Sequence, residues 1–132
     1  MKFLDSVKNS ELVINCIEND RETLVIALRG KISSSFTGSI LTKDLKSFNE
    51  HVYNRSPSWD RVVIDFRGLT YVNSIGAGMI ISLYRNFKES LSKIVLLFKR
   101  GSMVSETLSA IGFFKIYQPQ VVWDKYDQAI VS

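Results

Sequence analysis

The sequence is poor in the residues that build metal sites and nucleophilic catalytic centres. Its 132 residues include one cysteine, Cys16, and one histidine, His51. One cysteine cannot form an internal disulfide or a cysteine metal cluster, and one histidine undersupplies both the usual zinc ligand sets and a serine triad. We therefore expect a protein that is not an enzyme and that holds no metal or cofactor. Cys16 lies in an apolar run without a basic neighbour, which predicts a buried structural thiol.

Long apolar runs and blocks of basic residues are also missing. The densest apolar run, residues 94–98, is far shorter than the ~18 residues of a membrane span, and charge interrupts the N-terminus before any signal-peptide core develops. The net charge is +4, but Lys99-Arg100 is the only adjacent basic pair. We expect a cytoplasmic protein without membrane insertion and without nucleic-acid binding.

The amino-acid composition predicts one folded domain over residues 1–132. Apolar residues make up 45% of the chain and charged residues 23%, with only two prolines. This composition favours collapse around a single core.

The apolar pattern predicts an α/β fold. Two runs rich in strand formers, residues 12–17 and 23–28, flank a turn-like segment and indicate an antiparallel hairpin. Residues 61–66 and 93–98 are short apolar runs typical of buried parallel strands. Between them, residues 75–91 repeat apolar side chains every three to four positions, which predicts a helix.

The remaining segments complete the predicted order of elements. We expect helices over residues 40–52 and 104–111, the second ending at Gly112, and a last short strand over 113–117. Residues 123–130 predict a closing helix. The result is a mostly parallel five-stranded sheet with an N-terminal antiparallel strand and about four helices.

The segment from Asp65 to Gly78 carries the most specific pattern in the chain. It resembles the signature of the STAS family, anti-sigma-factor-antagonist type, in which a strand ending in Asp leads to Asp-Ser-(Ser/Thr)-Gly-x-Gly at a helix start. Asp65 matches the strand-end acid, Ser74 the phosphorylatable serine, and Gly76 and Gly78 the two glycines. The resemblance implies a STAS-like fold.

Three positions depart from the family pattern. Asn73 stands where the family usually has Asp, and Ile75 replaces the second Ser or Thr. Ser33 stands where an acid commonly follows the second strand. Anti-sigma-factor antagonists use this neighbourhood to contact a serine kinase, so these departures concern partner recognition.

The resemblance implies a regulator that binds an anti-sigma-factor-like serine kinase and is switched by phosphorylation of Ser74. A PP2C-type phosphatase is a further expected partner, and the oligomeric state stays open. Two alternatives also stay open: a non-phosphorylated STAS subunit of a larger assembly, such as a stressosome-like complex or a lipid-transport ABC system, and a small-ligand-sensing STAS domain. The predicted partner-binding residues are Ser33, Ser34, Asn73, Ser74, Ile75, Gly76, Ala77 and Gly78.

Physical chemistry of the helix start leaves two explanations for these residues. Asn and Ser are favoured helix N-caps, so capping alone is sufficient to explain Asn73-Ser74. Gly76 and Gly78 each cost about 1 kcal/mol against alanine inside a helix. Their presence predicts close approach by another backbone, either of the same domain or of a partner.

Overall fold

The computed structural model describes residues 2–20, 22–33, 60–90 and 93–131. These residues form a mixed six-stranded β-sheet with helices packed against it. Each strand is hydrogen-bonded to the strands before and after it in the sequence. The first three strands are antiparallel, and the last three run parallel to the third. They are β1 (Lys2–Lys8), β2 (Leu12–Asp20), β3 (Thr23–Ile32), β4 (Arg61–Val72), β5 (Lys93–Phe98) and β6 (Gln120–Trp123).

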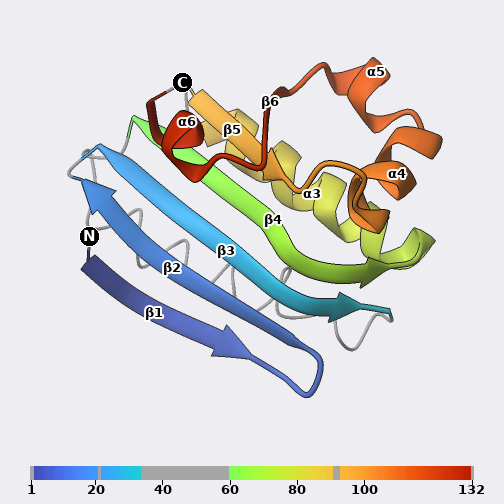
Figure 1. Cartoon of the computed structure of the whole chain (residues 1–132), viewed down its shortest axis with the longest axis horizontal. Coiled ribbons are helices and arrows are strands. Elements are labelled where there is room, and N and C mark those ends of the chain that lie inside the picture. Colours follow the sequence, from blue (N-terminus) through green and yellow to red (C-terminus); the bar gives the residue numbers. More distant parts are fainter. Residues whose placement is uncertain (1, 21, 34–59, 91–92, 132) are drawn as a thin grey trace.

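Helices lie on both faces of this sheet (Figure 1). On the far side in this view, α3 (Ser74–Ser90) packs behind β4 and β5, while α6 (Tyr126–Val131) lies in front of them. Strand alternation explains the two cores, because successive side chains point to opposite faces. Leu24 and Ile26 belong to the core under α3, whereas Val25 between them belongs to the smaller core under α6.

The sequence predictions of the α/β class and of several elements are confirmed. The hairpin corresponds to β2 and β3, the strand over 93–98 to β5, and the long amphipathic helix to α3. The helix predicted over 104–111 is α4 (Met103–Ala110), and Gly112 follows it with a φ of 82°. The predicted helix over 40–52 lies outside the described residues.

One strand was not predicted, because a bulge disrupts its alternation. β1 pairs with β2, and its register shifts between Phe3 and Asp5. The extra residue, Leu4, and the later Val7 both pack against the larger core. Their spacing of three residues is neither that of a regular strand nor a sufficient helix signal. The described sheet therefore has one more strand than predicted.

The predicted last strand over residues 113–117 is wrong. This segment is the short helix α5 (Phe113–Tyr117), and the last strand, β6, comes after Pro119. The aromatic side chains favour a strand intrinsically, but ring contacts decide the conformation. Phe113 lies 5.4 Å from Tyr84 of α3 between ring centroids, and Phe114 lies 5.5 Å from Phe98 of β5.

Candidate functional site

The junction between β4 and α3 holds the serine predicted to be functional. β4 continues to Val72, beyond the predicted end at Phe66, and delivers the chain directly to the helix. The Oδ1 atom of Asn73 accepts a hydrogen bond from the Gly76 amide at 2.9 Å, and its carbonyl accepts one from the Ala77 amide at 2.8 Å. Asn73 is therefore the N-cap of α3.

The structure therefore assigns different roles to Asn73 and Ser74, whereas the sequence allowed either residue to be the cap. Ser74 is the first residue of α3 and its side chain is exposed. Within the part of the chain that the structure describes, no group forms a hydrogen bond with the Ser74 hydroxyl. Because Asn73 already accepts the hydrogen bond from the Gly76 amide, Ser74 is not needed as the N-cap.

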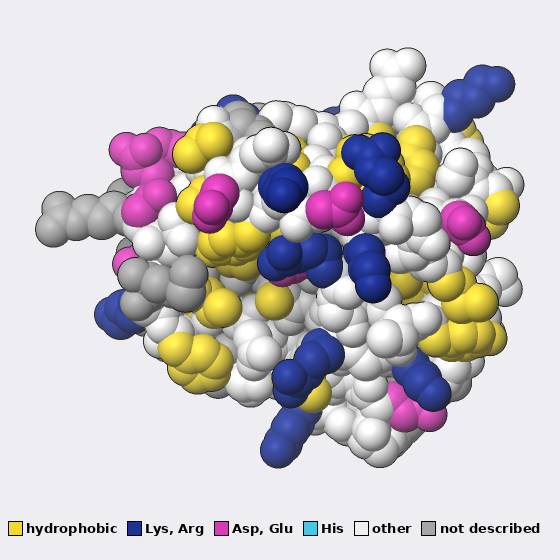
Figure 2. Space-filling model, in the orientation of Figure 1, with side chains coloured by type: hydrophobic (Ala, Val, Ile, Leu, Met, Phe, Trp, Pro, Cys, Tyr) yellow, Lys and Arg dark blue, Asp and Glu magenta, His cyan; other side chains and the backbone are white. Residues whose placement is uncertain are grey.

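Three exposed residues form what we call the helix-start surface: Ser74, Ile75 and Gly78. Ser74 and Gly78 are four residues apart and so lie on one face of the helix. Ile75 is a large apolar residue and is 48% exposed. Figure 2 shows hydrophobic side chains gathered at the end of the molecule where β4 leads into α3. The exposed Ile75 side chain and the open space at Gly78 leave this face of α3 accessible to a partner.

Two predicted partner-binding residues lie inside the domain instead. Gly76 is buried, and a Cβ atom there would lie 2.4 Å from the carbonyl oxygen of Ile32. Ala77 is fully buried in the larger core. Gly78 differs, because a Cβ atom there would meet nothing within 4 Å. The close approach predicted from the two glycines is thus internal at Gly76, and only Gly78 leaves open space.

The other predicted residues lie at the end of β3. Ser33 is half-buried, and its carbonyl oxygen accepts a hydrogen bond from the Asn73 Nδ2 atom at 2.6 Å. Its hydroxyl donates to the Glu11 Oε2 atom at 2.8 Å. Sequence reasoning missed Glu11, because the contact joins residues 22 positions apart and no local pattern marks it. Ser34 lies outside the described residues.

Asp65, which was predicted to end the strand, lies within β4, and its carboxylate binds Arg67 and not the start of α3. Its carboxylate is largely buried and accepts hydrogen bonds from the Nε and Nη2 atoms of Arg67, each at 3.0 Å. These bonds raise the already high pKa of Arg67, so the guanidinium stays charged. Arg67 also lies 5.8 Å from the ring centroid of Tyr126. Asp65 and Arg67 therefore help to hold α6 against β4.

Tyr126 makes the α6 packing sensitive to high pH. Burial raises the pKa of Tyr126 above its ordinary value of about 10, and the nearby negative charge of Asp65 acts in the same direction. A raised folded-state pKa means that the stability from the neutral phenol is present below about pH 10 and is lost as pH rises through the folded value. The phenol also donates to the Asn19 Oδ1 atom at 2.9 Å.

Replacing Tyr126 by phenylalanine is expected to lower the free energy of unfolding by about 1 kcal/mol at pH 8, through loss of this hydrogen bond. The difference between the two proteins should narrow as the pH rises from 9 towards 11, because only the wild-type side chain titrates. Urea denaturation of both proteins across this range measures the difference. A difference that stays constant would show that Tyr126 does not titrate differently in the folded and unfolded states.

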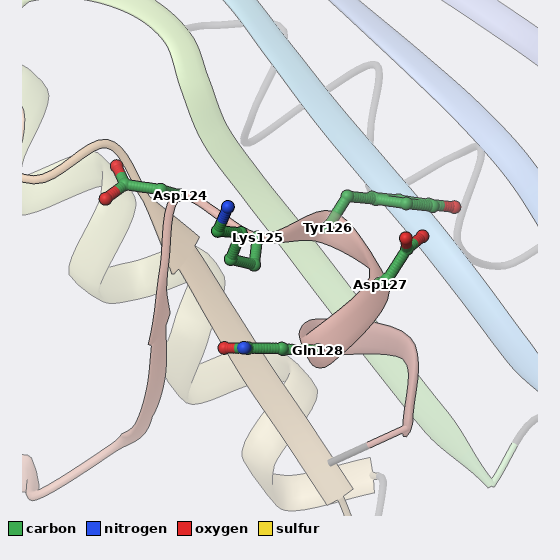
Figure 3. A pocket seen from close by; sticks show the side chains of 5 residues that line it. All are labelled: Asp124, Lys125, Tyr126, Asp127 and Gln128. Atoms are coloured by element: carbon green, nitrogen blue, oxygen red, sulfur yellow. The ribbon is translucent and has the colours of Figure 1, made fainter.

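A shallow hollow beside α6 is lined by five consecutive residues, Asp124 to Gln128. Figure 3 shows their side chains diverging, with Tyr126 and Asp127 on one side and Asp124 and Gln128 on the other. Small-molecule sites need convergent polar groups from several elements, so this hollow does not favour the ligand-sensing alternative. Within the described ranges, no three potential metal-ligating side chains come together. None of the described helices has the length and apolar character needed to cross a membrane.

Solved structures of anti-sigma factor antagonists have a fold similar to that of this chain. One such antagonist, from Mycobacterium paratuberculosis, superposes with a TM-score of 0.63 at 16% identity, over 91% of this chain and 92% of that one. SpoIIAA in its unphosphorylated form gives 0.62 at 16% identity, over 89% and 92%. The phosphorylated form of Bacillus SpoIIAA gives 0.59 at 19% identity, over 89% and 96%.

A family model identifies the family of the chain. The STAS domain model matches residues 10–129, and the chain belongs to the STAS domain family. No curated protein sequence matches the chain. The predicted family and fold class are thus confirmed, while the structures, at 16–19% identity, show the fold alone.

Proposed function

We propose that this protein is a regulator of the anti-sigma-factor-antagonist type that binds a serine kinase of the anti-sigma-factor kind through its helix-start surface. Phosphorylation of Ser74 by that kinase releases the partner, and a PP2C-type phosphatase restores the binding form. One observation carries the proposal: Ser74 is exposed at the first position of α3, while the neighbouring Asn73 does the capping.

A phosphorylated form is known for a protein of similar fold. SpoIIAA, which has a similar fold, has been solved in both unphosphorylated and phosphorylated forms. In this chain a phosphate on Ser74 would add about −1.5 to −2 charge beside the first amides of α3, where the helix dipole favours an anion. The domain would therefore keep its fold when modified.

Partner binding would respond in the opposite way. A partner resting on Ile75 and Gly78 would meet the bulk of the phosphate and would have to strip its hydration shell. Loss of an apolar contact and burial of an unpaired charge both oppose docking. The switch thus acts on the complex and not on the stability of the domain. A cytoplasmic regulator without enzymatic activity of its own fits this role.

The test is phosphorylation of Ser74 by the partner kinase with ATP. We expect one added phosphate on the peptide that contains Ser74 and none in the Ser74→Ala variant, measured by mass spectrometry. Protein carrying phosphoserine at position 74 should bind the kinase at least 100-fold more weakly than unmodified protein, measured by calorimetry.

Phosphoserine placed at Ser109 is the matched control, because Ser109 is exposed on α4 and not on α3. Its affinity should stay within threefold of the unmodified protein. Equal affinity of the Ser74-phosphorylated and unmodified proteins would contradict the switch, and phosphate found elsewhere would contradict the choice of serine.

A further inference from the structure

Glu11, in the turn between β1 and β2, is an exposed residue whose backbone and side chain are both held in place. Its amide donates to the Asn9 Oδ1 atom at 3.1 Å, and its carbonyl accepts from the Lys31 amide at 3.0 Å. Its carboxylate accepts from the Ser33 hydroxyl at 2.8 Å. Two backbone hydrogen bonds therefore hold the residue in the turn, and the hydrogen bond from Ser33 orients its carboxylate.

The same contacts connect Glu11 to the helix-start surface. Ser33, which binds the carboxylate, accepts a hydrogen bond from the N-cap Asn73, whose own Oδ1 atom binds the Gly76 amide of α3. A continuous hydrogen-bonded path thus runs from the carboxylate to the first turn that carries Ser74. Figure 1 shows the β1–β2 turn at the same end of the sheet as the start of α3.

Holding an exposed carboxylate in this way contributes little to folding. Ordering a glutamate side chain costs conformational entropy, and a hydrogen bond in contact with water offsets only part of that cost. A carboxylate ordered before binding, however, loses less freedom when a partner arrives. Its arrangement is thus better suited to recognition than to stability.

The chemistry of the carboxylate defines what it would recognise. Among the described residues, a neutral hydroxyl contacts it and no cation is paired with it. An ordered carboxylate matches the fork of an arginine guanidinium, or a lysine ammonium, through charge-assisted hydrogen bonds. Such a contact at the rim of an interface contributes mainly to partner selection.

We propose that Glu11 is a specificity-determining residue of the partner interface and binds an arginine or lysine side chain of the partner protein. Ser33 is the residue that positions it. This inference rests on the proposed function, because it assumes that the partner docks on the helix-start surface next to the carboxylate. The inference specifies that the partner presents a positive charge next to Glu11.

The experiment first captures the partner with a photo-crosslinking amino acid in place of Ile75, in the cell that makes the protein. The captured protein is then purified, and its affinity for the uncrosslinked full chain is measured by calorimetry. Glu11→Gln should weaken binding about tenfold and should reduce its dependence on salt concentration. Glu11→Arg should weaken binding further, and replacing the contacted partner cation by glutamate should restore it.

Two controls separate the possible outcomes. Glu22→Gln removes an exposed carboxylate at the opposite end of β3 and should change affinity less than twofold. Gly78→Trp fills open space on the helix-start surface and should weaken binding more than tenfold without a fall in melting temperature. The melting temperature of Glu11→Gln should match that of Glu22→Gln, because glutamine still accepts from Ser33.

Each outcome decides between the two proposals. If Gly78→Trp weakens binding while Glu11→Gln changes it less than twofold, the role of Glu11 is overturned and docking on the helix-start surface stands. If Gly78→Trp has no effect, or if nothing captured at position 75 binds the purified chain, docking on this surface fails and the role of Glu11 fails with it.

Discussion

Replacing Gly30 by alanine is expected to lower the free energy of unfolding by about 3 kcal/mol or more, combining backbone strain with a steric clash. Gly30 has a φ of 112°, which L side chains rarely adopt. A Cβ atom there would lie 2.0 Å from the carbonyl oxygen of Glu11, a backbone atom that cannot rotate away. Urea denaturation would measure the loss, and the melting temperature should fall by about 10 °C.

Gly101→Ala is the matched control for this prediction. Gly101 also has a positive φ, 74°, but a Cβ atom there would meet nothing within 4 Å. Only the backbone strain remains, and the expected loss is about 1 kcal/mol. Equal losses in the two variants would show that the turn carrying Glu11 can move away from β3, and that the carboxylate is not held as the structure indicates.

Alanine at Gly76 and alanine at Gly78 are expected to change stability in opposite directions. The Cβ atom of Gly76→Ala would meet the Ile32 carbonyl oxygen at 2.4 Å and the Ile32 side chain at 3.0 Å. This overpacking should lower the free energy of unfolding by about 1–3 kcal/mol. Gly78→Ala meets no atom and gains helix propensity, so it should raise the free energy of unfolding by as much as about 1 kcal/mol.

Chemical denaturation of the two variants under one set of conditions checks this pair. A stabilised Gly76→Ala protein would mean that α3 does not approach the end of β3 so closely. A destabilised Gly78→Ala protein would mean that the open face of α3 is covered. The pair therefore distinguishes internal packing from a free surface at positions two residues apart.

Local pattern predicted the elements whose burial is regular. The hairpin of β2 and β3 follows from two runs of strand formers, and α3 follows from apolar residues such as Ile80 and Phe87 spaced for one helix face. Regular periodicity predicts an element because burial on one side imposes it. Where a bulge interrupts alternation in β1, or where aromatic contacts determine α5, the same reasoning gave no prediction or a wrong one.

The candidate site was also predicted only in part from the sequence. The motif around Ser74 identified the start of the helix and left two candidates for its N-cap, Asn73 and Ser74. It could not assign the cap to Asn73, because that depends on which side chain reaches the Gly76 amide. Nor could the motif distinguish the environments of Gly76 and Gly78, since the difference depends on Ile32 of β3, which approaches only Gly76.

The sequence by itself determined the α/β class, the order of most strands and helices, and the helix start that carries Ser74, because these depend on neighbours a few residues apart. Only the tertiary structure decided that Gly76 packs inward while Gly78 faces open space, and that Glu11 lies beside Ser33. Such contacts depend on how strands are ordered in the sheet and on their register. Residues distant in the chain then come into contact at one end of the sheet, and no local sequence pattern predicts such contacts.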